Sequence, residues 1–536
     1  RHGRGAAGAE RHRRRSACPR MIGAIAAQLL KAATAQRAAR FHKALDDCKD
    51  AQQKTLACIV RTAATTEYGR HTGLRGHEDA RDFRAVVPVV TYDALWPWIE
   101  RASGAPNVIA PGIVHHFEST SGSGGSHKRI PYNDALLTSF RSLFAVWAND
   151  LLRESLHPRS GRIFVSVSPR LSAQSKARHD ADYLNGLTRL LVAPFLVEPN
   201  RCSINGHMVM FRDAVALALL NRADLEVISV WSPTYLLVLL SHVEARRGEL
   251  AKCLPHARAQ LLDVDAIDWM RVWPALQLIS CWTDGAASGP AKQLARHFPT
   301  ARIQGKGLIA TEAPLTVPLV RAGGCVPLID EVFIELEAAD GSMHLLHEAQ
   351  TGVEYAVVIT QPGGLLRYRL GDRVRAMDRW RDTPLLEFIG RVDAVCDLVG
   401  EKLHEMFVRQ VLRELVPSSA FALLVPRTGA VHAEYQLITD AENALPEHLD
   451  QALCANHRYR EARALGQLAP PKIIVLREAR RVVHDFLIEE KMAAGDIKDA
   501  ALLHSIDRAS RLLSAIEVRS TARGAQASST AVARTA

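Results

Sequence analysis

The segment Ser119-Thr-Ser-Gly-Ser-Gly-Gly-Ser-His-Lys128 carries the residue types that bind phosphate groups. Five hydroxyl side chains and three glycines lie within ten residues, and a lysine closes the run. Glycines let backbone N–H groups approach a phosphate closely, and hydroxyl side chains supply further donors. The spacing is not that of a Walker A loop, and a flexible surface loop is the alternative interpretation. By itself this segment leaves both interpretations open.

Two further segments combine glycines with an acidic residue. The first, Gly305-Lys-Gly-Leu-Ile-Ala-Thr-Glu312, is by itself typical of a turn and a short strand, with Thr-Glu opening the next helix. The second, Gly363-Gly-Leu-Leu-Arg-Tyr-Arg-Leu-Gly-Asp372, predicts an alternating strand that ends in Gly-Asp. An aspartate at a strand end can accept two hydrogen bonds from a ribose diol, and a plain turn aspartate is the alternative.

The order of these segments is more specific than any one of them. A fourth segment, Phe388-Ile-Gly-Arg-Val-Asp393, follows the other three, and alone it would also suit a linker with a surface ion pair. A hydroxyl-rich loop, then Thr-Glu, then Gly-Asp, then Gly-Arg-x-Asp is the order found in adenylate-forming enzymes. The flanking sequences resemble the GH3 family of acyl acid–amido synthetases. The matching residues are Thr66-Glu-Tyr-Gly69, Val87-Pro-Val-Val-Thr-Tyr92, Phe117-Glu-Ser-Thr-Ser-Gly122, Leu366-Arg-Tyr-Arg-Leu-Gly-Asp372, Phe388-Ile-Gly-Arg391, Gly400-Glu-Lys402, and Asn456, Tyr459 and Arg463 followed by Gln467-Leu468.

The resemblance extends over nearly the whole chain, from about residue 45 to about residue 505. It implies a large N-terminal adenylate-forming domain and a small mobile C-terminal domain, with ATP and Mg²⁺ bound between them. The residues that it implies for the site are Thr120, Ser121, Ser123 and Lys128 at the ATP phosphates, Thr311 and Glu312 at the nucleotide and Mg²⁺, Asp372 at the ribose, and Arg391 at the hinge beside the ribose or phosphate.

The resemblance also implies a catalytic lysine near the C-terminus, which would act together with Glu312. Lys498 is the candidate, and Lys491 is the alternative. The family usually has Gln-x-Lys-x-Pro-Arg at this position, whereas this chain has Asp496-Ile-Lys-Asp-Ala-Ala501.

The chemistry implied by the resemblance is the activation of a carboxylic acid. A carboxylate is a poor electrophile, and conversion to an acyl-adenylate supplies a good leaving group. Magnesium and cationic side chains offset the charge that builds on the phosphates. We expect an acyl acid–amido synthetase that transfers the acyl group to an amino acid or another amine. The alternatives are a thioester ligase of the acyl-CoA type and a degenerate protein that binds nucleotide or acyl acid without turnover.

The elements that must position these residues follow from hydrophobic patterns. Interspersed strands and helices predict a large α/β (α+β) domain over residues 21–391, followed by a small α+β domain over residues 392–513. The predicted strands are 163–168, 276–282, 332–337, 354–360, two within 420–440, and 472–480. The predicted helices are 21–66, 134–153, 236–254, 402–415 and 446–464. Residues 514–536 are expected to form a frayed tail.

The composition is that of a globular protein, with 536 residues of which 48% are hydrophobic and 23% charged. Residues 1–20 carry +6 of the net charge of +10. This basic head lacks aromatic residues, which argues against nucleic-acid binding. We interpret it as a disordered segment upstream of a natural start at Met21.

Nine widely spread cysteines without a Cys-x-x-Cys motif favour a reducing compartment. The longest apolar run, residues 227–243, is interrupted by polar residues and proline, which favours a buried helix over a membrane span. We therefore expect a cytoplasmic, monomeric protein that does not associate with membranes. Trp231 and Trp282 are candidates for the lining of an acyl pocket, and ordinary core packing is the alternative.

Overall fold

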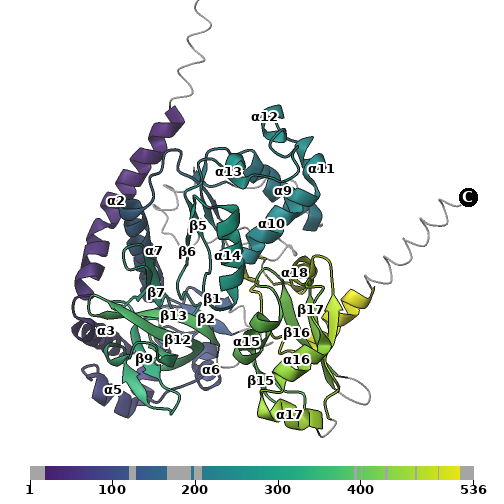
Figure 1. Ribbon diagram of the computed structural model, residues 1–536. Helices are drawn as coiled ribbons and strands as arrows, with labels where there is room; N and C mark the ends of the chain where they lie inside the picture. The colour runs from purple at the N-terminus through teal and green to yellow at the C-terminus, as the bar shows by residue number, and fades with distance from the viewer. Residues whose placement is uncertain are drawn as a thin grey trace, which may run out of the picture.

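A parallel sheet with helices on both faces forms the centre of the N-terminal part (Figure 1). The computed structural model describes residues 18–119, 128–165, 195–197, 208–391, 395–399, 401–428, 433–464, 467–492 and 494–518. The sheet contains, in spatial order, β3 (Arg162–Val165), β4 (Leu225–Ser229), β5 (Leu278–Ser280) and β6 (Arg302–Gln304), all parallel. The strands predicted at 163–168 and 276–282 correspond to β3 and β5.

Alternate side chains of each strand point to opposite faces of the sheet. In this parallel sheet the side chains on both faces are apolar and buried. Val227 and Leu278 pack with Leu151 on one face, and Ile228 and Ile279 belong to a larger cluster on the other. Figure 1 shows α2 and α7 along one side of the sheet and α10 and α14 along the other. The helices are α2 (Cys18–Ala44), α7 (Asp134–Glu154), α9 (Met208–Leu220), α10 (Pro233–Ala245) and α14 (Ser288–His297).

A five-stranded antiparallel sheet carries the second half of the N-terminal part. Its spatial order is β10 (Met343–Leu345), β9 (Phe333–Glu337), β11 (Glu354–Thr360), β12 (Tyr368–Trp380) and β13 (Thr383–Arg391). Helix α3 (Cys48–Ala63) packs on it, and the buried Gln52 amide donates to Ile329 O and Val332 O at 2.8 Å and accepts from Ile334 N. The predicted end of a strand at Asp372 is wrong. The strand continues through a bulge at Gly371 (φ 86°) and ends at Trp380.

The C-terminal part has its own sheet of β16 (Ala422–Arg427), β17 (Glu434–Thr439) and β18 (Lys472–Val475). Around it lie α15 (Glu405–Leu415), α16 (Pro446–Leu453), α17 (His457–Ala464), α18 (Ala479–Glu489) and a helix over residues 506–518. The end of α18 and the segment after it pack against the N-terminal part, where Ile488 and Ile497 join the core cluster of α10 and β5. Arg212 of α9 forms an ion pair with Asp485 of α18.

Capping side chains divide two of the predicted helices. The helix expected over 21–66 is two helices, because the Asp47 carboxylate accepts from Asp50 N and starts α3. The helix expected over 446–464 is α16 and α17, because Asn456 Oδ1 accepts from the N–H groups at the start of α17. The final helix extends four residues beyond Ser514, where the sequence predicts a frayed tail.

The remaining elements are short. They are α4 (Glu67–Thr72), α5 (Ala80–Val86), α6 (Tyr92–Arg101), β1 (His116–Ser119), β2 (Arg129–Tyr132), α11 (Arg247–Ala251), α12 (His256–Ala259), α13 (Trp269–Val272), η4 (Gly285–Ala287), β7 (Thr316–Leu319), β8 (Gly324–Pro327), η5 (Leu346–Glu348), β14 (Val395–Cys396), β15 (Leu403–His404) and η6 (Ala494–Asp496). None of the helices in the described part of the chain is both long enough and apolar enough to cross a membrane.

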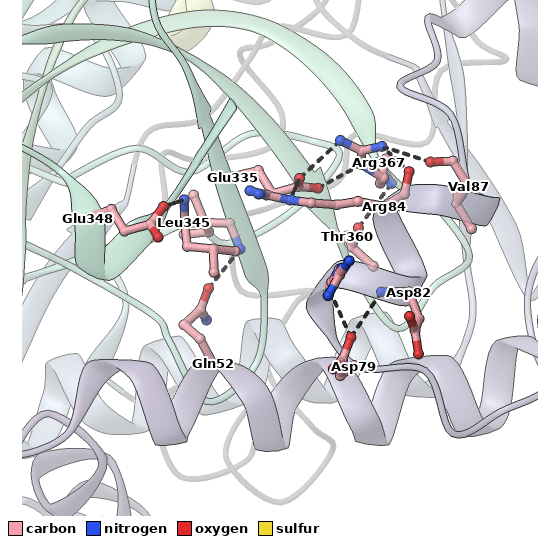
Figure 2. Close-up of polar contacts among 12 residues, drawn as sticks. Gln52, Asp79, Asp82, Arg84, Val87, Glu335, Leu345, Glu348, Thr360 and Arg367 are labelled. Carbon is pink, nitrogen blue, oxygen red and sulfur yellow. Dashed lines mark hydrogen bonds and ion pairs between the residues drawn. The ribbon is translucent and has the colours of Figure 1, made fainter. Parts of the chain in front are cut away.

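A buried ion pair joins the antiparallel sheet to the segment that precedes α6. Figure 2 shows Arg84 and Arg367 converging on the carboxylate of Glu335. The Glu335 side chain is 1% exposed and that of Arg367 is 7% exposed. Arg367 also donates to Val87 O at 2.8 Å, and its backbone N–H donates to Thr360 Oγ1 at 2.9 Å. The Glu335 carboxylate and the Arg367 guanidinium are therefore both hydrogen-bonded, which is the condition for burying them at tolerable cost.

We expect Glu335→Gln to lower the free energy of unfolding by about 3 kcal/mol, because it leaves two arginines without their shared counter-charge. Glu337→Gln is the matched control. Glu337 lies on the same strand and pairs with Arg369 of β12, but that pair is much more exposed. Its loss should cost at most about 1 kcal/mol. Urea unfolding of the two variants measures the difference, and equal effects would contradict the structural role given to the buried pair.

Candidate functional site

Lys128 lies at the base of a hairpin and is held between two tyrosines. Strands β1 and β2 pair antiparallel, with Ser119 opposite Arg129. Thr120, Ser121 and Ser123 belong to the connection between these strands and lie outside the described residues. The Lys128 Nζ is 3.3 Å from the Tyr368 hydroxyl and 5.8 Å from the centre of the Tyr92 ring. These tyrosines hold the ammonium group at the start of β12.

Thr311 and Glu312 occupy the tip of a tight turn. The backbone N–H and C=O groups of Ala310 and Ala313 bond to each other on either side of them, and no helix follows. The expectation that Thr-Glu opens a helix is therefore wrong, because the chain turns back on itself and enters β7. The Tyr132 hydroxyl donates to Thr311 O at 2.8 Å and ties this turn to the hairpin that carries Lys128.

Glu312 is only 6% exposed. Burial and, after it, the negative charge of Asp372 raise the pKa of its carboxyl group to about 7, against the opposing effect of Arg391 and Lys128. The same charges act on Tyr368, whose pKa is raised chiefly by burial and then by Glu312. Glu312 is thus a buried carboxylate close to a second carboxylate, and a cation bound there would favour its ionised form.

Asp372 and Arg391 face each other across β12 and β13. They are register partners, and Arg391 Nε lies 3.4 Å from Asp372 Oδ1. Arg391 also donates to Leu370 O at 3.3 Å. Asp372 is 8% exposed, whereas the Arg391 side chain is 40% exposed at the end of its strand. Residues 392–394, which follow directly, lie outside the described residues.

The charge cluster consists of Lys128, Glu312, Asp372 and Arg391, which lie more than 260 positions apart in the sequence at their extremes. Two cations and two largely buried carboxylates beside aromatic hydroxyls can bind a polyphosphate with its divalent cation and the polar face of a sugar. Among the described residues no group of three His, Cys, Asp or Glu side chains could hold a metal ion by itself. A divalent cation at Glu312 could take further ligands from water and from a bound phosphate.

Lys498 approaches the N-terminal part beside Trp282. Its Nζ lies 4.3 Å from the centre of the Trp282 ring and 5.7 Å from that of Phe388. The hydrogen bond from Ser232 N to Gly495 O, 3.0 Å long, holds the preceding residues in place. Lys491 lies in the turn after α18, and both lysine side chains are exposed. The Lys498 side chain therefore contacts two aromatic rings of the N-terminal part.

The two candidate tryptophans contact each other at the carboxyl ends of neighbouring strands. Trp231 follows β4 and Trp282 follows β5, with ring centres 5.7 Å apart and a hydrogen bond from Trp282 N to Trp231 O. Trp231 also lines an apolar cavity of about 250 Å³ between the parallel sheet, α2 and α7. The tryptophan pair therefore lies between Lys498 and the cavity. Of the two rings, that of Trp231 forms part of the cavity wall and that of Trp282 does not.

Sequence reasoning missed three contributors to this region. Tyr92 and Tyr368 lie within segments that match the family, but nothing in those segments indicated that both would contact Lys128. Lys306 lies in the Gly305–Glu312 segment, and its side chain enters the cavity. A signal existed for Lys306, namely a lysine directly after a buried strand, where ligands meet the carboxyl ends of parallel strands.

Comparison with known proteins agrees with this architecture. The overall fold is that of adenylate-forming enzymes. A solved 2-hydroxyisobutyryl-CoA ligase in the postadenylation state superimposes with a TM-score of 0.50 at 15% identity, covering 88% of this chain and 91% of that one. The model of the GH3 family N-terminal domain matches residues 37–265, and that of the GH3 family central domain matches residues 331–391. The chain belongs to the GH3 family.

Individual members of the family show the same extent of similarity. The solved structure of the AtGH3.15 acyl acid amido synthetase in complex with 2,4-DB has a TM-score of 0.74 at 17% identity, covering 90% of this chain and 96% of that one. The indole-3-acetic acid-amido synthetase GH3.8 of Oryza sativa subsp. indica is 24% identical in an alignment 453 positions long, which covers 72% of this chain and 72% of that one. The similarity is therefore distributed along the whole fold.

The raised pKa of Glu312 predicts a pH dependence of stability in the free protein. An acid whose pKa is higher in the folded state stabilises that state fully below its unfolded pKa of 4.5, and the contribution is lost as the pH rises through about 7. Between about pH 5 and about pH 8, wild-type protein should lose ~3 kcal/mol relative to Glu312→Gln. Urea unfolding at both pH values measures this, with exposed Glu447→Gln as control. If the free energy of unfolding changed equally with pH in wild type and Glu312→Gln, the raised pKa of Glu312 would be contradicted.

Proposed function

We propose that this protein is an ATP-dependent acyl acid–amido synthetase. The observation that carries the proposal is the charge cluster of Lys128, Glu312, Asp372 and Arg391, in a chain of the GH3 family whose parallel sheet borders an apolar cavity. Relatives of similar length are named amido synthetases. The charged groups of the cluster can bind a nucleoside triphosphate, and the apolar walls of the cavity can bind the apolar body of a carboxylic acid.

The reaction has two steps. A carboxylate oxygen of the acid attacks the α-phosphorus of ATP, the bond to the β-phosphate oxygen breaks, and acyl-AMP and pyrophosphate result. The nitrogen of an amine then attacks the acyl carbon, the bond to the AMP oxygen breaks, and the proton of the nitrogen passes to solvent. No oxidant or reductant is required, and the free energy comes from the phosphoanhydride bond of ATP.

The proposed binding roles follow from the charge and burial of each group. Lys128, together with Thr120, Ser121 and Ser123 of the adjoining connection, would bind the ATP phosphates. Glu312 and phosphate oxygens would hold Mg²⁺, a hard cation that prefers one or two carboxylates plus phosphate ligands, and the ion would offset the phosphate charge. The raised pKa of Glu312 and the neighbouring Asp372 fit such a cation. Thr311 would lie at the nucleotide.

The other polar groups would orient the nucleotide and the reacting carboxylate. Asp372 would accept hydrogen bonds from the ribose diol, and Arg391, which is already paired with it, would lie beside the ribose or a phosphate. Lys498 would donate to the carboxylate and the α-phosphate during adenylation. Support for Lys498 comes from its place on Trp282, at the interface between the N-terminal part and the segment after α18.

The direct test offers the purified protein ATP, Mg²⁺ and a panel of carboxylic acids and follows pyrophosphate release. Amino acids and coenzyme A are then added, and mass spectrometry identifies the product. We expect acid-dependent release of pyrophosphate and an amide product with an amino acid or another amine. A coenzyme A thioester would identify the acyl-CoA type of ligase instead. Binding of nucleotide or acid without any release of pyrophosphate would identify a binding protein.

A second prediction concerns the catalytic lysine. Lys498→Ala should slow acyl-adenylate formation by ~100-fold, as for the loss of one donor to a developing charge. Amide formation from synthetic acyl-adenylate should be nearly unchanged, because the C-terminal domain would have moved after adenylation. Lys491→Ala is the matched control, since it removes a neighbouring exposed lysine in the turn after α18. Equal loss of both steps in Lys498→Ala would indicate a structural role, and a selective defect in Lys491→Ala would reverse the assignment.

A further inference from the structure

A second cavity, of about 230 Å³, lies between α2 and α7. Its walls come from the second half of α2, the last turns of α7, the end of β7 with the turn after it, and the turn between β12 and β13. Among the described residues, none lines both this cavity and the apolar cavity. Trp380 in its wall is eight residues along β12 from Asp372, which is about 26 Å of strand. The second cavity is therefore separate from the charge cluster.

Three arginines line the second cavity, and two of them lack a carboxylate partner in the part of the chain that the structure describes. Arg381 donates to Asp46 Oδ1 at 2.8 Å and is already paired. Arg153 donates through Nε to the neutral Asn149 Oδ1 at 2.9 Å. For neither Arg153 nor Arg321 does a described residue supply an ion pair. Two positive charges at this cavity are therefore available to an anionic group.

The three guanidinium groups gather around His42 of α2, which also lines the second cavity. Burial lowers the pKa of its imidazole, and the positive charges of Arg381, Arg153 and Arg321 lower it as well. Three cations drawn from α7 and two turns thus act on one ring. A carboxylate bound beside them would offset their mutual repulsion and accept charge-assisted hydrogen bonds.

Asp150 supplies a negative charge in the wall of the same cavity and is only 5% exposed. Its Oδ2 accepts from Val320 N at 2.7 Å, and no described residue donates to its other oxygen, Oδ1. Burial and, after it, the charge of Glu154 raise the pKa of the Asp150 carboxyl group to about 6. The hydrogen bond from Val320 and the charges of Arg302 and Arg321 oppose this shift. A cationic donor reaching Oδ1 would favour the ionised form.

Much of the remaining wall of the second cavity is apolar. It consists of Ala35, Ala38 and Ala39 of α2 together with Leu319 and the ring of Trp380. The volume is below the range of about 300–1,000 Å³ that is typical for drug-sized ligands, so the ligand must be small. A molecule that matches all parts of the wall has a carboxylate, an ammonium group and a compact apolar body. These are the groups of a free α-amino acid with an apolar side chain.

We propose that the second cavity is a binding site for a free α-amino acid with an apolar side chain. Arg153 and Arg321 bind the carboxylate, and Asp150 Oδ1 accepts a hydrogen bond from the ammonium group. Leu319 and Trp380 contact the side chain. Both charges of the ligand are then compensated, which is the condition for withdrawing them from water. The inference goes beyond the proposed function, because an amino acid held here is too far from the charge cluster to be the acceptor of the acyl group.

The test irradiates the full chain, without ATP, in the presence of photo-leucine, the diazirine analogue of L-leucine. Mass spectrometry of the digested protein should find the label within residues 35–42, 149–154, 319–321 or 380–381. L-Leucine should compete with this labelling at least about tenfold better than 4-methylpentanoic acid or 3-methylbutylamine. The first of these analogues lacks the ammonium group and the second lacks the carboxylate, so each loses one charge-assisted interaction.

Two variants remove one charge each from the second cavity. Asp150→Asn keeps an oxygen that can accept from Val320 N, and Arg321→Met removes the charge of an exposed side chain. Each should reduce the labelling of the cavity at least about tenfold without changing the melting temperature by more than a few degrees. Arg296→Met is the matched control, since it removes an exposed arginine in the last turn of α14, and it should be labelled as wild type. If Asp150→Asn fails to fold, Arg321→Met decides by itself.

Label found only outside these four segments would overturn the inference. Equal competition by L-leucine and 4-methylpentanoic acid would overturn it as well, because the ammonium group would then have no partner in the cavity. Unchanged labelling in Arg321→Met would do the same for the carboxylate. Labelling requires neither ATP nor turnover, so the result stands whether or not the protein releases pyrophosphate in the test of the proposed function.

Discussion

The buried ion pair between Arg367 and Glu335 is the constraint on which the candidate site depends. Arg367 holds β9 through Glu335 and the backbone of Val87 through a second hydrogen bond. Tyr368 follows it in the chain, and the backbone of Val90 is bonded to Arg367 O and to the amide of Arg369, so Tyr92 is carried to the same place. Both tyrosines then meet Lys128. This buried charge pair, which is costly to break, therefore fixes the positions of Lys128, Tyr92 and Tyr368 at the start of β12.

The charge cluster holds two buried carboxylates beside two cations, and the carboxylates could not be buried at low cost without that positive charge. Glu312 sits at the tip of a turn and Asp372 after a bulge, and both carboxylates are largely withdrawn from water. Lys128 and Arg391 offset their charge only in part, since the pKa of Glu312 is still raised. Such a cluster favours the arrival of a divalent cation with its own phosphate ligands, because binding then relieves the repulsion between the two carboxylates.

The tryptophan pair connects the two parts of the chain. Trp282 meets Lys498 of the C-terminal part, and Trp231 forms a wall of the apolar cavity. The segment after α18 is packed into the core of the N-terminal part, so the position of Lys498 depends on that contact as well as on its own sequence. The wall of the cavity and the contact of Lys498 with the N-terminal part thereby share one pair of side chains.

The local pattern of the sequence was enough to predict much of the fold and to identify the family. The strand at 354–360 and the helix beginning at residue 134 follow from the spacing of their apolar residues, because these residues are the ones that each element buries. The motifs likewise indicated Lys128, Glu312, Asp372 and Arg391. Tertiary structure alone decided that Asp372 lies within a strand and that Thr311 and Glu312 form a turn instead of a helix cap. It also decided that Lys306 enters a cavity, since these outcomes depend on pairing with segments distant in the sequence.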